Sequence, residues 1–169
     1  FFLLIPIALF IAKDQIYFYF FSDMQIDSAR YQLLEKSILI AIDHFPFGSG
    51  FGTFGSYASA LNYSKLYYEY GLSNVNGLSI GHMTFVSDSF WPMITAQFGF
   101  LGLLIYIRLL LVLFRKIQLV KTYNMFLYLG CLFIYIYLVI ISVAESSFVN
   151  PITIPMAILL GFCFGKVEI

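Results

Sequence analysis

Long apolar runs occupy the C-terminal half of the chain, and a more polar region precedes them. The runs cover residues 90–114, 124–144 and 149–165. Because a helix that crosses a membrane needs about 20 mainly apolar residues, the pattern predicts a membrane helix over each run. The last run is the shortest, and it contains Pro151 and Pro155.

The chain also begins inside an apolar run. Residues 1–12 are too short to cross a bilayer alone, and they are followed by Lys13 and by the aromatic residues 16–21. Aromatic side chains are enriched at membrane–water interfaces. We therefore interpret residues 1–21 as a truncated membrane helix with its interfacial belt. The chain has no initiating Met and no signal-peptide pattern, so we interpret it as the C-terminal fragment of a longer membrane protein.

The intervening residues 22–89 hold most of the charge, and we expect them to form one large outer loop with amphipathic helices. Asp27 or Ser28 can cap a helix that runs to about His44. The apolar positions of this helix recur at helical spacing on one face, and they are Leu34, Ile38, Ile42 and Phe45. Such a helix lies on a membrane surface or against other helices.

A glycine-rich stretch, HFPFGSGFGTFGSYAS, follows at residues 44–59 and contains the spacing G-x-G-x-x-G. A dinucleotide-binding loop needs a strand before this spacing and a helix after it, and here a helix comes before it. Two interpretations remain open. The stretch is a tight turn at the membrane surface that needs glycine, or its N–H groups bind an anionic ligand. In the second case Gly48, Gly50 and Gly52 contact substrate.

A tyrosine-rich stretch at residues 57–70 predicts a second short helix, and residues 71–81 predict a loop. Tyr57 and Tyr67 are candidates for stacking on sugar rings. The same tyrosines are also typical of an interfacial belt, and both interpretations remain open.

Composition identifies lipid as the solvent for much of the chain. Hydrophobic residues make up 61%, aromatic residues 20% and charged residues only 11%, with a mean hydropathy of +0.89. The net charge of zero argues against a nucleic-acid partner. Arg115, Lys116 and Lys121 lie between two apolar runs, which predicts that this connection is cytoplasmic and that residues 22–89 are outside. The expected fold is an all-α polytopic membrane protein of about four membrane helices.

The order of five motifs resembles the C-terminal half of the O-antigen polymerase and O-antigen ligase family of bacterial envelope enzymes. The motifs are DSARYQLL, FPFGSGFGTFGSY, YSKLYYEYGLSNVNGLS, DSFWPMITAQFGFLG and ESSFVNP. The tyrosine-rich motif looks most like the polymerase branch. Many family members, ligases above all, begin the fourth motif with a histidine and an asparagine, where this chain has Asp88 and Ser89.

The resemblance implies an enzyme that polymerises oligosaccharide repeat units carried on undecaprenyl pyrophosphate, on the outer face of the cytoplasmic (inner) membrane. It implies the lipid bilayer and the lipid-linked glycan as partners, with a chain-length regulator as a further one, and no cofactor. The alternatives are a ligase that transfers glycan to another acceptor, a polysaccharide transporter or flippase, and a non-catalytic scaffold. The two cysteines and two histidines show no metal-ligand spacing.

Three residues are candidates for catalysis. Such a transfer needs a cation for the departing pyrophosphate and a base for the acceptor hydroxyl. Arg30 is the candidate cation, because guanidinium pairs well with phosphate. Asp88 is the candidate base or sugar-binding carboxylate, and Glu145 is an acid at the end of an apolar run. The alternatives are a solvated Arg30, a helix-capping Asp88 and an interfacial Glu145.

Overall fold

The computed structural model describes residues 28–88 and 90–165, and within these ranges it contains helices and turns but no β-strand. The predicted all-α class is therefore confirmed for the part of the chain that is described. The predicted truncated helix at residues 1–21 lies outside the described residues. The helices are α2 (Ala29–Asp43), α3 (Tyr57–Leu61), α4 (Lys65–Glu69), α5 (Phe90–Tyr123), α6 (Met125–Ile141) and α7 (Thr153–Gly165), with short 3₁₀ turns η2 (Leu72–Asn74) and η3 (Ser147–Val149).

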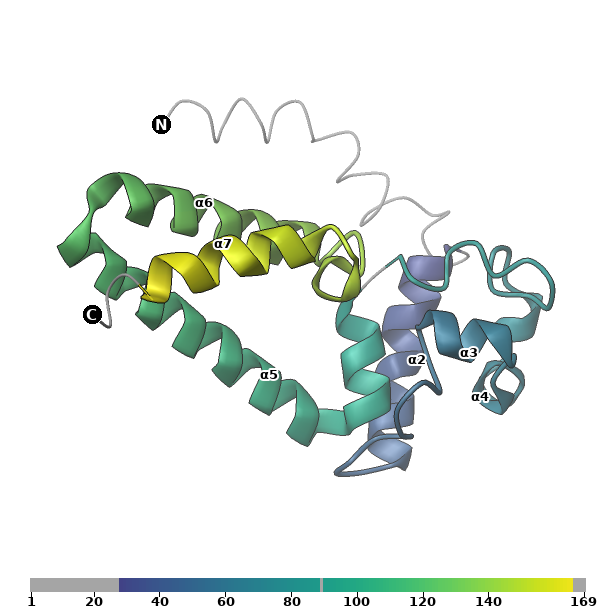
Figure 1. Cartoon of the computed structure of the whole chain (residues 1–169). Coiled ribbons are helices and arrows are strands. Elements are labelled where there is room, and N and C mark those ends of the chain that lie inside the picture. The colour runs from purple at the N-terminus through teal and green to yellow at the C-terminus, as the bar shows by residue number, and fades with distance from the viewer. Residues whose placement is uncertain (1–27, 89, 166–169) are drawn as a thin grey trace.

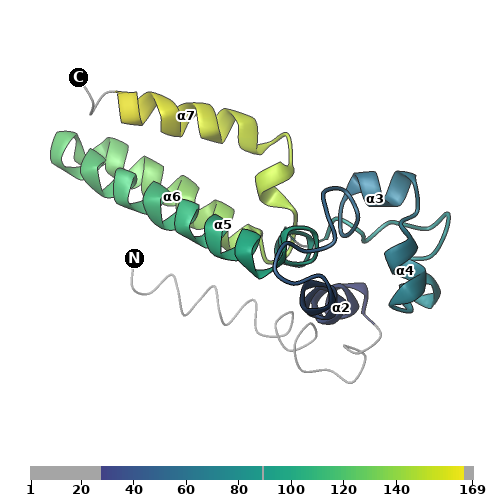
Figure 2. The same cartoon turned by 90° about the horizontal axis from the view of Figure 1, so that it is seen from below.

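The helices form two groups that α5 connects (Figure 1). The long second part of α5 lies with α6 and α7 on one side of the molecule, and Figure 2 shows the same grouping from below. The first part of α5 lies with α2, α3 and α4 on the other side. Most of the apolar runs thus lie in one group, and the more polar region lies in the other together with the start of the first apolar run.

Helix α2 begins where the sequence predicts. The Ser28 hydroxyl accepts a hydrogen bond from the N–H of Tyr31 at 3.3 Å, which caps the helix. One face is buried and packs toward α5, with Leu33 and Ile40 fully buried. The predicted apolar stripe lies on exposed positions instead: Leu34, Ile38, Ile42 and Phe45 are 44–70% exposed.

Helix α5 is broken at Gly99, whose φ of 63° and ψ of −167° are not helical. Residues 90–98 form a first arm that is mostly buried, and residues 100–123 form a second arm that is mostly exposed. The helix also runs to Tyr123, nine residues beyond the predicted membrane span at residues 90–114. The connection expected after residue 114 is helical, and only Asn124 separates α5 from α6.

By length and composition, α5 is the one helix in the described ranges that is long and apolar enough to cross a membrane. Helices α6 and α7 are apolar but shorter than the predicted spans at residues 124–144 and 149–165. Where they pack on α5, Cys131 and Cys163 lie as free thiols in a buried cluster with Ile117 and Leu160. The structure therefore supports an apolar helical group, and the number of membrane crossings stays a prediction.

The tyrosine-rich stretch forms two short helices rather than one. A serine begins each of them: Ser56 caps α3 through a reciprocal pair of hydrogen bonds with Ser59, and the Ser64 hydroxyl accepts from the N–H of Leu66. Residues 62–64 separate the two helices. The sequence signal missed here is the second serine, because serine favours a helix start over a helix interior.

The glycine-rich stretch fills the break in α5. The N–H of Ser49 donates to the Ala96 carbonyl at 2.9 Å, and the N–H of Gly50 donates to the Gln97 carbonyl at 3.0 Å. The side chain of Gln97, itself buried, accepts from the N–H of Gly52 at 2.9 Å. A broken helix leaves carbonyls without helical partners, and this loop supplies the partners.

Glycine is required at this junction because two backbones meet there. A Cβ atom on Gly48 would lie 2.6 Å from the Ala96 carbonyl oxygen, and one on Gly99 would lie 2.6 Å from the Gly48 nitrogen. Both glycines also have a positive φ, which side chains rarely tolerate. Of the two interpretations of the glycine-rich stretch, the tight turn is the one that these contacts support.

Candidate functional site

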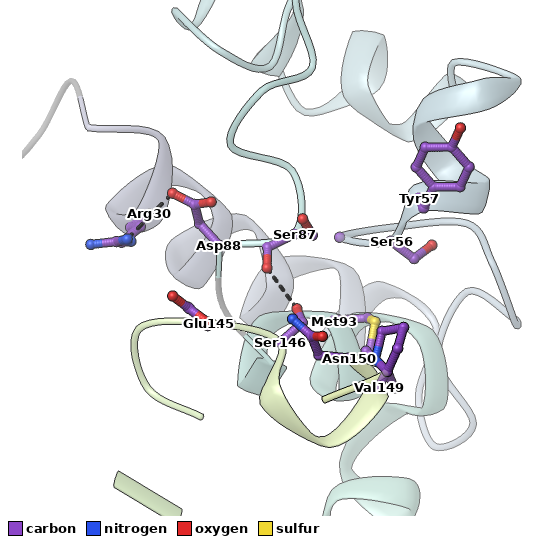
Figure 3. Close-up of a pocket in the computed structure, with 12 residues that line it drawn as sticks. Arg30, Ser56, Tyr57, Ser87, Asp88, Met93, Glu145, Ser146, Val149 and Asn150 are labelled. Atoms are coloured by element: carbon purple, nitrogen blue, oxygen red, sulfur yellow. Dashed lines mark hydrogen bonds and ion pairs between the residues drawn. The ribbon is translucent and has the colours of Figure 1, made fainter. Parts of the chain in front are cut away.

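A pocket of about 410 Å³ collects residues from four distant segments of the chain. These are the first turn of α2, the end of the glycine-rich stretch, the residues just before α5, and the turn between α6 and α7. Its polar lining consists of Arg30, Ser56, Tyr57, Ser87, Asp88, Glu145, Ser146 and Asn150 (Figure 3). Because most of these groups can donate or accept hydrogen bonds, the pocket suits a polar or charged ligand.

All three predicted catalytic residues line this pocket. The Arg30 guanidinium donates to the Asp88 carboxylate at 3.3 Å, across 58 residues of sequence. Glu145 lies beside this pair in Figure 3. The Arg30 and Asp88 side chains remain 33% and 27% exposed, so a ligand in the pocket can reach both. The structure thus brings together one cation and two carboxylates that the sequence places far apart.

Two serines hold the end of α6 against the start of α5. Both the N–H and the hydroxyl of Ser146 donate to the Ser87 carbonyl, at 3.2 and 2.8 Å. The Ser142 carbonyl accepts from the N–H of Phe90 at 3.3 Å, and its hydroxyl accepts from the indole N–H of Trp91 at 3.0 Å. Asp88 follows Ser87 in the chain, and Glu145 precedes Ser146. The bonds between these two serines therefore hold the two pocket carboxylates near each other.

The environment raises the pKa of Asp88 above its ordinary value. Partial burial is the largest cause, and the negative charge of Glu145 acts in the same direction. The Arg30 guanidinium opposes this shift by stabilising the carboxylate. A carboxylate with a raised pKa is a stronger base than an ordinary aspartate, which is the property that proton abstraction near neutral pH needs.

The other predicted substrate residues have different positions. Tyr57 lines the pocket, and its side chain is 73% exposed. Gly48, Gly50 and Gly52 do not line it. The N–H of Gly48 donates to the backbone carbonyl of His44. The N–H groups of Gly50 and Gly52 donate to the backbone carbonyl and the side-chain carbonyl of Gln97, respectively. The interpretation of this stretch as an anion cradle is therefore corrected, because protein acceptors already occupy its donors.

Tyr67 also lies outside the pocket. Its side chain is fully buried and stacks on Phe54 with ring centroids 5.6 Å apart. The Tyr67 hydroxyl accepts from the N–H of Gly55 at 3.0 Å and pairs with the Ser59 hydroxyl at 2.9 Å. The expectation that Tyr67 stacks on a sugar is corrected, because the ring has no exposed face and instead supports the wall of the pocket from behind.

Sequence reasoning missed four polar residues that line the pocket: Ser56, Ser87, Ser146 and Asn150. Hydroxyl and amide groups are suited to the hydroxyls of a sugar. A signal was present for three of them, since Ser56 belongs to the FPFGSGFGTFGSY motif, and Ser146 and Asn150 belong to the ESSFVNP motif.

A second, mainly apolar pocket of about 260 Å³ adjoins the first. The two share Val149, Asn150 and Pro151 as wall residues. The apolar pocket extends from this wall along the start of α7, where Ile154 and Ala157 line it. A polar pocket with a guanidinium therefore continues into an apolar groove, an arrangement that suits an amphiphile with an anionic head group.

Comparison with protein-family models, with curated protein sequences and with solved structures found no match. The motif resemblance therefore stays a prediction. Within the described ranges, no three His, Cys, Asp or Glu side chains lie together as metal ligands would. The two histidines, His44 and His82, do not line the pocket.

Proposed function

We propose that this protein polymerises oligosaccharide repeat units linked to undecaprenyl pyrophosphate, on the outer face of the cytoplasmic membrane. The observation that carries the proposal is the convergence of Arg30, Asp88 and Glu145 in one pocket. These residues come from three of the motifs that resemble the O-antigen polymerase and ligase family. The adjoining apolar groove offers a place for the first isoprenoid units of a lipid-linked donor.

Each of the three charged residues has a role in the proposed reaction. The acceptor hydroxyl gives its proton to the Asp88 carboxylate, and its oxygen forms a bond to the anomeric carbon of the donor sugar. The bond from that carbon to the pyrophosphate oxygen breaks, and Arg30 stabilises the departing anion. Glu145 raises the basicity of Asp88 and accepts hydrogen bonds from sugar hydroxyls. The products are a longer glycan on the acceptor lipid and free undecaprenyl pyrophosphate.

The charge distribution supports an outward-facing pocket. The bases Arg115, Lys116 and Lys121 lie near the turn at Asn124, where α6 begins. Glu145 and the pocket follow the opposite end of α6. Since basic residues concentrate on the cytoplasmic side, the pocket faces the outside in the proposed orientation. The second arm of α5, α6 and α7 form the membrane part, and the α2–α4 group lies above it.

A ligase would use the same leaving group and the same guanidinium, so the pocket alone fits both reactions. The polymerase is preferred because the family's ligases resemble this chain least at the fourth motif, where Asp88 replaces a histidine. A transporter is not favoured by any contact in the described ranges. The two reactions differ in product, and this difference allows a direct test.

The test is to express the full-length protein in a strain that lacks its polysaccharide polymerase and to separate the surface glycan on a gel. We expect a ladder from the wild type and single repeat units from Asp88→Asn, which removes the base but keeps the side-chain size. Asp43→Asn is the matched control, because Asp43 accepts from the Tyr70 hydroxyl at 2.6 Å outside the pocket. Glycan restored only in a ligase-deficient strain would replace the polymerase proposal with a ligase.

The pH dependence of polymerisation tests the role of Asp88 separately. Because the pKa of Asp88 is raised, kcat/KM is expected to fall on the acid side with a midpoint above the ordinary value of 3.8. Glu145→Gln removes a negative charge that raises this pKa, so the acid limb should move to lower pH while part of the activity remains. The measurement is repeat-unit consumption in detergent across a pH series. An acid limb that Glu145→Gln leaves in place would argue against Asp88 as the base.

A further inference from the structure

A cluster of exposed phenylalanines surrounds the break in α5. Phe45 and Phe47 are each 70% exposed, and Phe51 is 84% exposed. The ring of Phe45 lies 6.5 Å from that of Phe100, and the ring of Phe51 lies 6.2 Å from that of Phe98, so the cluster is seated on both arms of α5. Large apolar groups gathered at one exposed place mark a surface that contacts something other than water.

This cluster continues two other apolar surfaces. On one side it follows the exposed stripe of α2, where Ile38 is 44% and Ile42 is 55% exposed. On the other side it meets the second arm of α5, where Leu101 is 43% and Leu104 is 65% exposed. Figure 1 shows the loop at the end of α2 where the two arms of α5 meet. The exposed apolar residues of the loop therefore adjoin those of the candidate membrane span and follow those of α2 along the chain.

The protein itself satisfies several polar groups of this loop. Residues 45–56 contain no charged side chain. The N–H groups of Ser49 and Gly50 donate to carbonyls freed by the break in α5, and the hydroxyls of Ser49 and Thr53 pair at 2.7 Å. Irregular backbone is tolerated within the hydrocarbon region only where it is buried in protein. Because the backbone of residues 45–52 is only partly covered, it fits the membrane interface, where aromatic side chains are enriched.

We propose that the loop of residues 45–52 lies at the membrane interface, with the side chains of Phe45, Phe47 and Phe51 inserted among the lipid chains. The first arm of α5, residues 90–98, spans roughly 13 Å at 1.5 Å per residue, and the pocket lies at the end of this arm away from the loop. The inserted phenylalanines therefore anchor the arm that joins the membrane surface to the pocket, and only the relevance of this anchoring to a lipid-linked substrate rests on the proposed function.

Spin labels on introduced cysteines test the insertion. The full-length protein, with its native cysteines replaced by serine, receives one label at Phe51→Cys or at Phe47→Cys and is reconstituted in phosphatidylethanolamine–phosphatidylglycerol vesicles. Leu61→Cys is the matched control, because Leu61 is apolar and 66% exposed but lies on α3. Collision rates with oxygen, which concentrates in hydrocarbon, are compared with those of a water-soluble nickel chelate.

The expected result is that oxygen collisions dominate at positions 47 and 51, while nickel collisions dominate at position 61. Nickel collisions at all three positions would overturn the proposal, since the loop would then lie in water. Labels at 47 and 51 that are shielded from both reagents would also overturn it, because another protein surface would be the occupant. These readouts do not depend on enzymatic activity, so they separate this proposal from the proposed function.

Discussion

Replacing Gly99 by alanine is expected to produce a large loss of stability. The φ and ψ of Gly99 fall in a region that is essentially reserved for glycine, and occupying it costs about 1–3 kcal/mol. The new Cβ would also lie 2.6 Å from the Gly48 nitrogen and 2.9 Å from the Pro46 carbonyl carbon. Overpacking of this kind adds about 1–3 kcal/mol. Since proteins are stable by only about 5–15 kcal/mol, little folded protein should remain at elevated temperature.

Gly81→Ala is the matched control for this prediction. Gly81 also has a positive φ, 78°, but a Cβ there would meet no atom within 4 Å. Only the backbone strain of roughly 1–2 kcal/mol applies. Thermal unfolding in detergent and the amount of protein in the membrane should rank wild type above Gly81→Ala and Gly81→Ala above Gly99→Ala. Equal unfolding temperatures for the two variants would show that the loop packed into the break contributes little.

Arg30→Ala is expected to reduce polymerisation by about 10²–10³-fold, the loss typical when one group that stabilises transition-state charge is removed. Its ion pair with Asp88 is partly exposed, and such pairs contribute only about 0–1 kcal/mol to stability. The variant protein should therefore accumulate in the membrane while its surface glycan collapses to single repeat units. Arg30→Lys should keep part of the activity, because lysine retains the charge but not the planar fork of donors.

Lys36→Ala is the matched control on the same helix. Lys36 pairs with Glu35 at 3.1 Å and does not line the pocket. A wild-type ladder from Lys36→Ala beside single units from Arg30→Ala would locate the requirement for positive charge in the pocket. A wild-type ladder from both variants would remove Arg30 from the proposed mechanism. Loss of the ladder in both would point to the general charge of α2 instead.

Local features of the structure followed from the sequence wherever short-range physics decides them. The start of α2 was predicted from a cap at Asp27 or Ser28, and Ser28 is the cap, because its hydroxyl acts on an N–H only three residues away. The all-helical class followed from long apolar runs. The end of α5 was predicted too early, because the apolar run stops at residue 114 whereas the helix continues through Arg115 and Lys116. Charged side chains of this type are good helix formers.

The apolar stripe of α2 shows the limit of pattern reasoning. Periodicity identified Leu34, Ile38 and Ile42 as one face, and they do share a face. The packing of α2 on α5 uses other positions, Leu33 and Ile40 among them. An apolar face predicts that something apolar covers it, but the pattern does not distinguish a neighbouring helix from lipid.

By itself, the sequence determined the helical class, the lipid-compatible composition and the capped start of α2. It also singled out Arg30, Asp88 and Glu145, each on chemical grounds. Only the tertiary structure decided that these three share a pocket and that Tyr67 and the three glycines do not line it. The reason is physical: residue chemistry and capping act over a few positions, whereas the pocket depends on the break at Gly99 and on bonds such as Ser146 to Ser87. These contacts join segments far apart in the chain, and no local pattern encodes which distant carbonyl a donor will meet.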